Sequence, residues 1–557
     1  MLNKTGSTAQ DHSPLDNFGG GLPAPPGIPG FQKNLQSMKK LDKLALFKNV
    51  GSSWFALGVN ISVGIFISPY IIHHLGDDAF GLWFLVFSIT GYYGLFDLGI
   101  RSSIVRYVAT YSATQNKEEL NRLISTALFT YSGIGAVAIL ITVSGSFYVD
   151  SIFKISPQFL HTARWLFLIV GSAVSLGFPM GVFGGVLEGL QRFYLLNFTS
   201  IGATVLRAIS IVIAVRHGYG LLVVALITVL MPLISGLVNA TVVLSILPLR
   251  LHLNNVSRES LRRIATYSSS TFIIIVAARL RFKTDAMVIG TFLSSSAITY
   301  FAIGSRLVDY GGEVVSGLAQ VFVPMSSKSD ATGDLAGLRR ILVAGNRACA
   351  LIIFPIAAIL IVLGKSIIEA WVGVRYVSTS YPVLLVLIIP STLMLAQSAS
   401  GRVLFGMAKH KSLAIVTLLE GSANLFLSIF LVRHFGILGD AAGTAIPLAC
   451  TTLLFLPRHL CRVLKLRIGI YLREAFLLPL MLCAPLVAVL LLIRHWFVAH
   501  NYVQLAIQLL AGSVVYGVGL LWAIWTRKAW QVEGIHDQDT ANQLAVGLIE
   551  TYQQEEI

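Results

Sequence analysis

Long apolar runs of about 20 to 28 residues recur along the whole chain, and they restrict its fold more than any other feature of the sequence. Lipid offers the backbone no hydrogen bonds, so a chain crosses a membrane either as helices or as a closed barrel. The strands of a barrel are only about 10 residues long and alternate in polarity, which these runs do not. The sequence therefore predicts an all-α polytopic membrane protein.

Composition agrees with that prediction. Hydrophobic residues make up 55% of the 557 residues and charged residues only 12%, about half the charged fraction of a soluble domain. The four cysteines stand singly, no Cys/His cluster occurs, and no Walker-type phosphate loop is present. We therefore expect no disulfide framework, no metal or other cofactor, and no direct hydrolysis of ATP.

A hydropathy window of about 19 residues places about fourteen transmembrane helices along the chain. Six are expected at 47–73, 80–106, 122–147, 162–187, 195–215 and 220–248. Six more are expected at 264–292, 297–325, 338–364, 381–404, 412–433 and 437–461, followed by two at 473–494 and 502–526. The resulting organisation is a disordered cytoplasmic tail at 1–46, an N-terminal six-helix lobe at 47–248, a cytoplasmic connector at 249–263, a C-terminal six-helix lobe at 264–463, helices 13 and 14 at 472–526, and an acidic cytoplasmic tail at 527–557.

The basic residues indicate the orientation of these spans. The net charge of +15 does not indicate nucleic-acid binding, because the basic residues form small groups between apolar segments and not one continuous patch. With the N-terminus inside, 28 of the 41 Lys and Arg residues fall in cytoplasmic tails, loops and helix ends. This bias follows the positive-inside rule for an even number of spans, so both termini are predicted to be cytoplasmic.

An internal repeat divides the spans into two halves. The stretch from Gly184 to His217 matches the stretch from Gly401 to His434 at a constant offset of 217 residues. The same offset pairs residues of the first two spans with residues of the seventh and eighth. One offset that persists this far predicts two related six-helix lobes, and repeated transporters bind their substrate between such halves.

Short motifs in the first 200 residues carry a family resemblance. They are Asn49 to Asn60, Pro69, His74-Leu75-Gly76, Phe80-Gly81-Leu82-Trp83, Phe96-Asp97-Leu98-Gly99-Ile100, Arg106-Tyr107 and Gly185 to Arg192. With these motifs the chain resembles the polysaccharide transporters, the O-antigen type of lipid-linked oligosaccharide flippase, in the multidrug/oligosaccharidyl-lipid/polysaccharide (MOP) exporter superfamily. The resemblance covers about residues 45 to 465.

That resemblance implies a fold and a function. The two lobes would form the V of a multidrug and toxic compound extrusion (MATE) transporter, which opens alternately to each side, with two further C-terminal helices. The implied cargo is an undecaprenyl-diphosphate-linked oligosaccharide, moved from the cytoplasmic to the outer leaflet of a bacterial inner membrane for surface polysaccharide export. Two lobes already enclose one cavity, so a monomer suffices.

Span seven carries four intramembrane ionisable residues, Arg279, Arg281, Lys283 and Asp285. Placing each of them in the membrane costs about 2.5–3.5 kcal/mol on insertion scales, so we expect each to have a structural or functional role. On a continuous helix Arg279 and Lys283 share one face, and Arg281 and Asp285 pair on the opposite face as i,i+4 neighbours. Two interpretations remain open: a neutralised network that clamps spans seven and eight, or a cavity face on which Arg279 and Lys283 bind the pyrophosphate. The corresponding positions of the first half are uncharged, which favours the second.

Further intramembrane residues extend the candidate site. Arg207 and Arg347 are cavity candidates, with interactions at helix carbonyls as the alternative, and Glu420 is a candidate proton carrier. Aromatic residues of span two, among them Trp83 and Phe87, offer surfaces for sugars, although packing is their commoner role. The predicted pyrophosphate-binding residues are Arg279, Lys283, Arg207 and Arg347, and the predicted ion-coupling or charge-network residues are Arg281, Asp285, Arg306, Asp309, Glu313 and Glu420.

Two other functions remain as alternatives. A cation-coupled exporter of small amphipathic drugs on the same fold should line its cavity with carboxylates, against which the net positive span seven argues. An integral-membrane glycosyltransferase or polymerase usually needs a sizeable extramembrane loop, and the predicted external loops reach only about 15 residues. The energy source is open: coupling to H+ or Na+ would use Asp309, Glu313 or Glu420.

Overall fold

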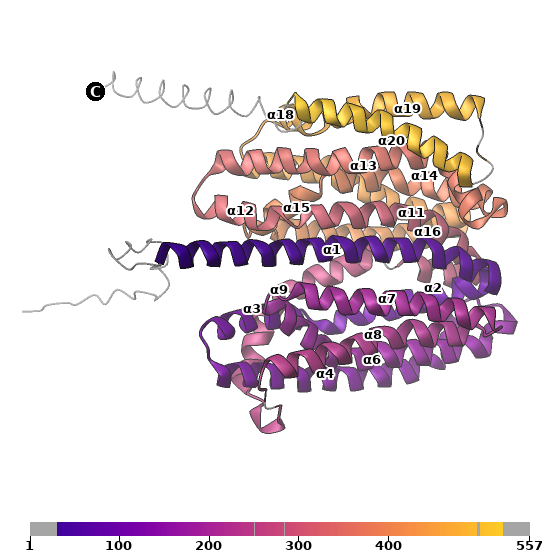
Figure 1. Cartoon of the computed structure of the whole chain (residues 1–557). Coiled ribbons are helices and arrows are strands. Elements are labelled where there is room, and N and C mark those ends of the chain that lie inside the picture. Colours follow the sequence, from indigo (N-terminus) through magenta and orange to yellow (C-terminus); the bar gives the residue numbers. More distant parts are fainter. Residues whose placement is uncertain (1–30, 250, 283, 498, 500–501, 527–557) are drawn as a thin grey trace, which may run out of the picture. The chain divides into compact units, whose positions relative to one another are not determined.

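The computed structural model describes residues 31–249, 251–282, 284–497, 499 and 502–526 (Figure 1). Residues 1–30 and 527–557, where the sequence predicts tails, and the candidate site residue Lys283 lie outside this range. Contacts divide the chain into two units, Met1–Gly51 and Ser52–Ile557. Of the first unit the structure describes the beginning of helix α1, and the helix groups and cavities belong to the second.

The described residues are helical almost throughout and contain no strand, which confirms the predicted all-α class. The first half contains α1 (Phe31–Leu75), α2 (Asp77–Gly91), the 3-10 helix η1 (Tyr92–Asp97), α3 (Ile100–Ala113), α4 (Lys117–Ser146), α5 (Val149–Ile152), η2 (Pro157–Phe159), α6 (Leu160–Gly189), α7 (Phe193–Arg216), α8 (Leu221–Ile246) and η3 (Leu253–Asn255). The second half contains α9 (Arg258–Phe282), α10 (Asp285–Phe292), α11 (Ser295–Ala319), α12 (Phe322–Ala331), α13 (Leu335–Val372), α14 (Val374–Ala396), α15 (Ser398–Gly406), α16 (Lys411–Cys450), the π-helix η4 (Thr451–Phe455), α17 (Leu456–Val463), α18 (Ile468–Leu472), the π-helix η5 (Arg473–Leu477), α19 (Leu478–Trp496) and α20 (Tyr502–Trp525). Because α1 begins at Phe31, the described part of the tail predicted at 1–46 is helical.

Eleven helical segments of the described chain are long and apolar enough to cross a membrane. The predicted spans at 264–292 and 297–325, which carry the intramembrane charges, are not among the eleven. The predicted spans at 412–433 and 437–461 fall within one segment, Lys411–Val463, that Gly436 interrupts with a left-handed φ of 58°. The membrane-spanning character is therefore confirmed, and the number fourteen stays a prediction.

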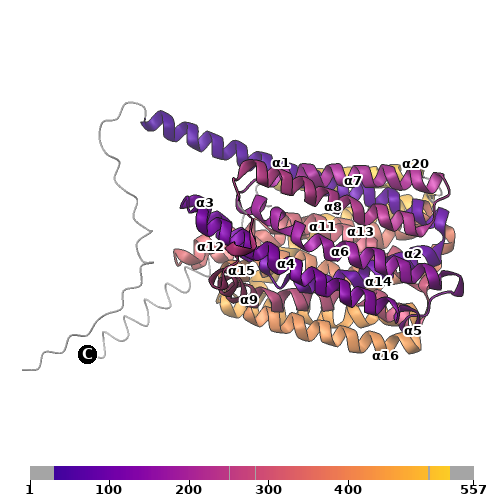
Figure 2. The same ribbon diagram turned by 90° about the horizontal axis from the view of Figure 1, so that it is seen from below.

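Two groups of helices pack within the second unit (Figures 1 and 2). In the N-terminal helix group, defined as α1 from Ser52 onward with α2 to α8, helices α4, α6 and α8 pack side by side and α7 packs against α8. In the C-terminal helix group, α9 to α17, helix α13 packs against α14 and α9 against α16. Helices α19 and α20 pack on each other and on α13, whereas α2 and α11 contact each other across the two groups.

The internal repeat is visible in the backbone. Gln191, in the turn between α6 and α7, has a φ of 57°, and Ala408, in the turn between α15 and α16, has a φ of 55°. The two residues are 217 positions apart, which is the offset of the sequence repeat. A left-handed φ is uncommon outside glycine, so its recurrence at equivalent turns supports the division into related halves.

Predicted spans two and seven are among those that are broken where continuous helices were expected. In span two, Leu98 and Gly99 adopt left-handed φ values of 50° and 79° between η1 and α3. In span seven, α9 ends at Phe282 and α10 begins at Asp285. The expectation that Arg281 and Asp285 are i,i+4 neighbours assumed one continuous helix, and the break between α9 and α10 removes that assumption.

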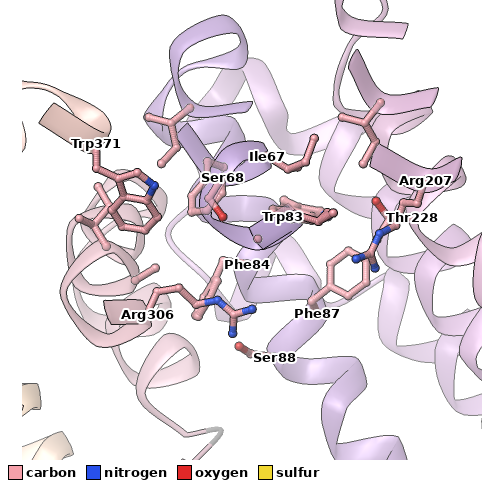
Figure 3. A pocket seen from close by; sticks show the side chains of 17 residues that line it. Ile67, Ser68, Trp83, Phe84, Phe87, Ser88, Arg207, Thr228, Arg306 and Trp371 are labelled. Atoms are coloured by element: carbon pink, nitrogen blue, oxygen red, sulfur yellow. The ribbon is translucent and has the colours of Figure 1, made fainter. Parts of the chain in front are cut away.

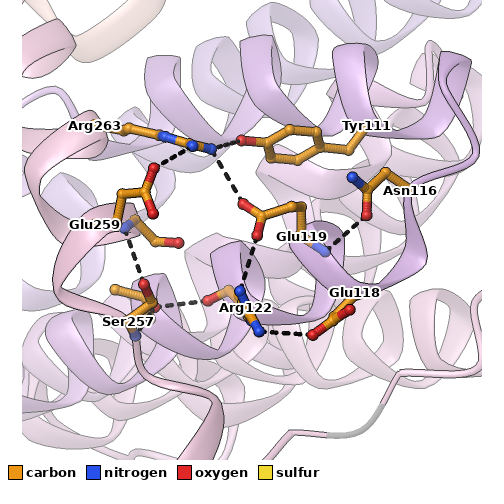
Figure 4. Close-up of polar contacts among 10 residues, drawn as sticks. Tyr111, Asn116, Glu118, Glu119, Arg122, Ser257, Glu259 and Arg263 are labelled. Atoms are coloured by element: carbon orange, nitrogen blue, oxygen red, sulfur yellow. Dashed lines mark hydrogen bonds and ion pairs between the residues drawn. The ribbon is translucent and has the colours of Figure 1, made fainter.

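The segment predicted as the connector, 249–263, holds the start of α9 to the N-terminal helix group (Figure 4). Arg263 donates to the hydroxyl of Tyr111 at 2.6 Å and pairs with Glu119 at 3.1 Å. Glu119 also pairs with Arg122 at 3.2 Å. Farther along, α9 packs against α16, so this one helix belongs to the packing of both groups.

Candidate functional site

A cavity of about 280 Å³ lies between the two helix groups (Figure 3). Helices α1, α2, α7 and α8 line it from the N-terminal group, and α11 and α13 line it from the C-terminal group. Arg207 on α7 and Arg306 on α11 both line this cavity, and Figure 3 shows their guanidinium groups on opposite sides of it. We call this space the central cavity.

Arg207 gives the central cavity a positive charge that no described acidic side chain pairs with, whereas the charge of Arg306 is partly compensated on its own helix. In the part of the chain that the structure describes, Arg207 forms no hydrogen bond and no ion pair, and it lies close enough to Arg306 for the two charges to repel. Arg306 has a distant ion pair with Asp309, at 3.9 Å, and lies over the ring of Tyr310 at 5.0 Å. No acidic side chain is among the described residues that line the cavity. Like charges repel strongly in a medium of low dielectric, so an anion between the guanidinium groups would stabilise this arrangement.

Aromatic rings cover much of the cavity wall. Trp83, Phe84 and Phe87 line it from α2, and Trp371 lines it from α13. Trp83 contacts Phe87 edge-on, with 5.4 Å between the ring centroids. Its indole N–H is buried and has no hydrogen-bond partner among the described residues. The wall thus offers aromatic surfaces and one unused donor beside the two arginines.

One end of the central cavity is closed by contacts between the helix groups. Asp77, at the start of α2, accepts hydrogen bonds from Arg375 and Tyr376 at the start of α14. The indole N–H of Trp371 donates to the backbone carbonyl of Ile65 at 2.6 Å. Sequence reasoning missed this closure, because Asp77 and Arg375 are ordinary loop residues in the sequence and only tertiary packing brings them together.

Arg279, predicted to bind pyrophosphate, does not line the central cavity. Its guanidinium lies against Gly94 in η1, where any side chain larger than hydrogen would collide with it. It is also close to the hydroxyl of Tyr92, which hydrogen-bonds to Thr284 at 2.8 Å. The position leaves Arg279 packed against the N-terminal helix group.

Arg281 and Glu420 form a buried ion pair inside the C-terminal helix group. Nε of Arg281 is 2.5 Å from Oε1 of Glu420, and the side chains are 14% and 2% exposed. The amide of Asn424 also donates to the backbone carbonyl of Arg281 at 3.2 Å. These contacts join α9 to α16, and they tie up the carboxylate that the sequence analysis proposed as a proton carrier.

Arg347, predicted to line the cavity, instead joins two helical segments through its contacts with Glu474. Its Nη2 lies 3.2 Å from Oε2 of Glu474, and its Nε donates to the backbone carbonyl of Glu474 at 2.7 Å. The side chain is only 3% exposed. Because Glu474 belongs to η5, the pair joins α13 to the segment that leads into α19. Arg347 is not among the described residues that line the central cavity.

A polar cluster inside the C-terminal helix group contains a residue that sequence reasoning missed. The hydroxyl oxygen of Thr444 lies within hydrogen-bond distance of a carboxylate oxygen of Asp285, at 2.7 Å, and of the amide oxygen of Asn424, at 2.9 Å. Asp440, one helical turn before Thr444, is completely buried near Asp285. Neither carboxylate oxygen of Asp440 has a hydrogen-bond partner among the described residues. Its signal in the sequence was a single acidic residue inside an apolar run, between Gly439 and Ala441.

The remaining predicted residues lie between these two sites. Asp309 and Asp285 line a small cavity of about 90 Å³ together with Arg281 and Thr444. Glu313 lies one turn beyond Asp309 on α11 and is close enough to Arg306 for electrostatic attraction. The structure therefore separates the predicted site into a cationic cavity between the helix groups and an acidic cluster inside one of them.

These features define a class of protein: a polytopic helical membrane transporter with a charged cavity between two halves. Solved structures share the fold. One is an inward-closed lipid II flippase MurJ, with a TM-score of 0.67 and 16% identity over 86% of this chain and 99% of that chain. Another is an inward-facing MATE multidrug transporter of the MOP superfamily, with a TM-score of 0.63 and 14% identity over 73% of this chain and 94% of that one.

The family follows from the sequence comparisons. A family profile described as "Polysaccharide biosynthesis protein" matches residues 74–381, more than half of the chain, and the chain belongs to that family. A Shigella flexneri protein named as a candidate O-antigen transporter is 20% identical over 75% of this chain and 99% of its own length. An uncharacterized membrane protein of Bacillus subtilis, EpsK, is 21% identical over 76% of this chain and 85% of its own length. The family resemblance in the sequence motifs is thereby confirmed.

Proposed function

We propose that this chain is a flippase that moves an undecaprenyl-diphosphate-linked oligosaccharide from the cytoplasmic to the outer leaflet of a bacterial inner membrane. The observation that carries the proposal is the pair Arg207 and Arg306, which face one cavity from two helix groups without an acidic side chain among the described lining residues. Similar proteins support it, since one is a lipid II flippase and another is named as a candidate O-antigen transporter.

The two arginines would bind the pyrophosphate of the cargo. A guanidinium presents several N–H donors in a planar fork that fits phosphate oxygens, and its charge does not depend on pH in the physiological range. Because each helix group supplies one arginine, a pyrophosphate between them replaces a repulsion across the cavity with two attractions. The cavity with bound pyrophosphate then favours a closer approach of the two helix groups than the empty cavity does. A ligand that binds one conformation more tightly than another shifts the equilibrium between them.

The closed end of the cavity fits an inward-facing state. With both termini in the cytoplasm, as the basic residues predict, the turn between α1 and α2 lies on the outer side. The contacts of Asp77 with Arg375 and Tyr376 then close the outer end. Transport would require these contacts to break while the cytoplasmic ends of the two helix groups approach each other. Both helix groups and the cavity belong to one chain, so a monomer would suffice.

The acidic cluster would provide ion coupling. The buried carboxylate of Asp440 and the half-buried carboxylate of Asp285 lie close together, so a proton or a small cation would stabilise the pair, and oxygen atoms of Asn424 and Thr444 lie beside them. A monovalent cation at this place, H+ or Na+, would change the packing of α10 against α16. Asp285 and Asp440 replace Glu420 as the proposed coupling residues, since Glu420 is held by Arg281.

A cationic-drug exporter is the second candidate, and the same cavity argues against it. Two arginines without a carboxylate among the described lining residues repel a cationic cargo. An anionic drug would meet no such barrier, so the decisive test must use lipid-linked substrate.

Complementation with paired variants tests the proposal. A host that lacks its flippase receives the wild type, the Arg207→Gln and Arg306→Gln double variant, or an Arg216→Gln control, whose exposed arginine ends α7. We expect surface polysaccharide with the wild type and the control, and accumulation of lipid-linked intermediate with the double variant. An Arg279→Gln variant tests the position that the sequence predicted. Normal export by a double variant that is inserted at wild-type levels would contradict the proposal.

A further inference from the structure

A second cavity, of about 600 Å³, lies inside the N-terminal helix group. Helices α1, α3, α6, α7 and α8 form most of its wall. It shares Phe87, Arg207 and Thr228 with the central cavity, so the two cavities meet at Arg207. Its volume is within the range of ~300–1,000 Å³ that small-molecule sites occupy. We call it the side cavity.

The polar part of its lining is mostly neutral. Amides and hydroxyls line it, and some of them already have partners: the lining residue Thr204 donates to Asn60 at 3.1 Å, and the lining residue Asn239 accepts from Thr199, outside the lining, at 2.9 Å. Arg101 also lines it and is held by Glu188 on α6 at 2.7 Å. Groups of this kind are costly inside a membrane unless they serve a polar ligand or hold helices together. Hydroxyls and amides, with a guanidinium at the edge, are the partners that sugar hydroxyl groups need.

The side cavity exists because its wall contains glycines at close intervals. Gly177, Gly181 and Gly184 lie on α6, and Gly236 lies on α8. A Cβ atom built on Gly181 would meet no heavy atom within 4 Å, so the space beside it is open. A glycine inside a helix costs about 1 kcal/mol of stability relative to alanine. Close packing of a neighbouring helix does not explain a glycine at position 181, because no neighbouring atom is close to it.

We propose that the side cavity is the glycan subsite and holds the sugar units nearest the pyrophosphate. The inference rests on the proposed function. The first sugar is bonded directly to the pyrophosphate, so a pyrophosphate at Arg207 places it at the junction of the two cavities. From there the side cavity offers polar groups, whereas the central cavity offers mainly aromatic and aliphatic walls. The N-terminal helix group then selects the glycan. The interface between the two helix groups binds the pyrophosphate, which all such lipids share.

Filling the side cavity tests this subsite. Gly181→Trp places a large ring in the open space, and Gly202→Trp on α7 is the matched control, since Gly202 also lacks a neighbour within 4 Å and is exposed. The purified proteins are titrated with two probes: undecaprenyl diphosphate without sugar, and the lipid-linked oligosaccharide that accumulates when the chain is deleted in its own host. We expect Gly181→Trp to weaken binding of the oligosaccharide lipid at least about tenfold, to leave binding of the sugar-free lipid unchanged, and Gly202→Trp to change neither.

A second variant covers the case in which Gly181→Trp does not fold. Asn60→Leu keeps the size of the side chain and removes its polar atoms, and we expect it to weaken binding of the oligosaccharide lipid about tenfold, with the sugar-free lipid unaffected. Wild-type affinity of both variants for both lipids would overturn the subsite, as would an equal loss for both lipids. Failure of the wild type to bind either lipid would overturn the proposed function instead, so the two failures are distinguishable.

Discussion

Arg207 in the central cavity and two arginines inside the C-terminal helix group differ in their partners. Arg281 and Arg347 are buried in ion pairs with Glu420 and Glu474, whereas Arg207 has no such pair among the described residues. All of these residues lie in apolar segments, and the sequence alone gives no reason to separate them. The comparison indicates that pairing, and not depth in the membrane, distinguishes an arginine that holds helices together from one that is available to a ligand.

Breaking the pair of Arg281 with Glu420 should give the largest effect on stability. Glu420→Gln removes the negative charge but keeps the side-chain shape, so it leaves Arg281 buried without compensation. We expect the free energy of unfolding to fall by about 3–5 kcal/mol, measured by thermal unfolding in detergent. The Arg281→Met and Glu420→Leu double variant removes both charges and should recover most of the loss. A double variant as unstable as the single one would show that the pair is not the cause.

The second pair should be less sensitive, because Glu474 has another partner. Arg473 lies 3.0 Å from Oε1 of Glu474, so Arg347→Gln leaves that carboxylate partly compensated. We expect a loss of about 1–3 kcal/mol, smaller than for Glu420→Gln. Limited proteolysis should show earlier cleavage near η5, which loses its link to α13. A loss as large as that of Glu420→Gln would mean that Arg473 gives no compensation.

The unpaired arginine should behave in the opposite way. Arg207→Gln removes a charge that repels Arg306, so we expect the free energy of unfolding to change by no more than about 0.5 kcal/mol. Binding of the oligosaccharide lipid should weaken at least about tenfold, since a charge-assisted contact to phosphate is lost. A strong loss of stability without a change in affinity would place Arg207 among the structural arginines.

An exposed ion pair should give the smallest effect. Arg164, near the start of α6, donates to Asp150 in α5 at 2.6 Å, and this hydrogen bond holds the pKa of the Asp150 carboxyl below its ordinary value. A depressed pKa contributes stability above the ordinary value for aspartate, about 3.9, and that contribution is lost as the pH falls through the pKa of the folded protein. Asp150→Asn should therefore lower the melting temperature slightly at neutral pH and not at all in strong acid. A melting-temperature decrease as large as that of Glu420→Gln would contradict the dependence on burial.

The sequence predicted the fold class well, and the site only in part. Apolar runs and the 217-residue offset depend on local composition and on repetition, so they can be read without a structure. The meeting of Arg207 with Arg306 depends on how α7 and α11 face each other across two helix groups, which no local pattern encodes. On an unbroken helix Arg279 and Lys283 would share a face, but α9 ends at Phe282. Asp440 was missed because a single carboxylate in an apolar run forms no linear motif. The free-energy cost of a carboxylate in the membrane was the only signal in the sequence that could have identified it.

The most direct test of the cationic cavity is the rate of transfer across a membrane. Purified protein is reconstituted into liposomes that contain labelled undecaprenyl-diphosphate-linked oligosaccharide, and the lipid that reaches the opposite leaflet is measured over time. The wild type and the Arg216→Gln control should transfer it, whereas the Arg207→Gln and Arg306→Gln double variant should remain at the rate of protein-free liposomes. Wild-type transfer by a stably folded double variant would show that the two arginines do not bind the cargo.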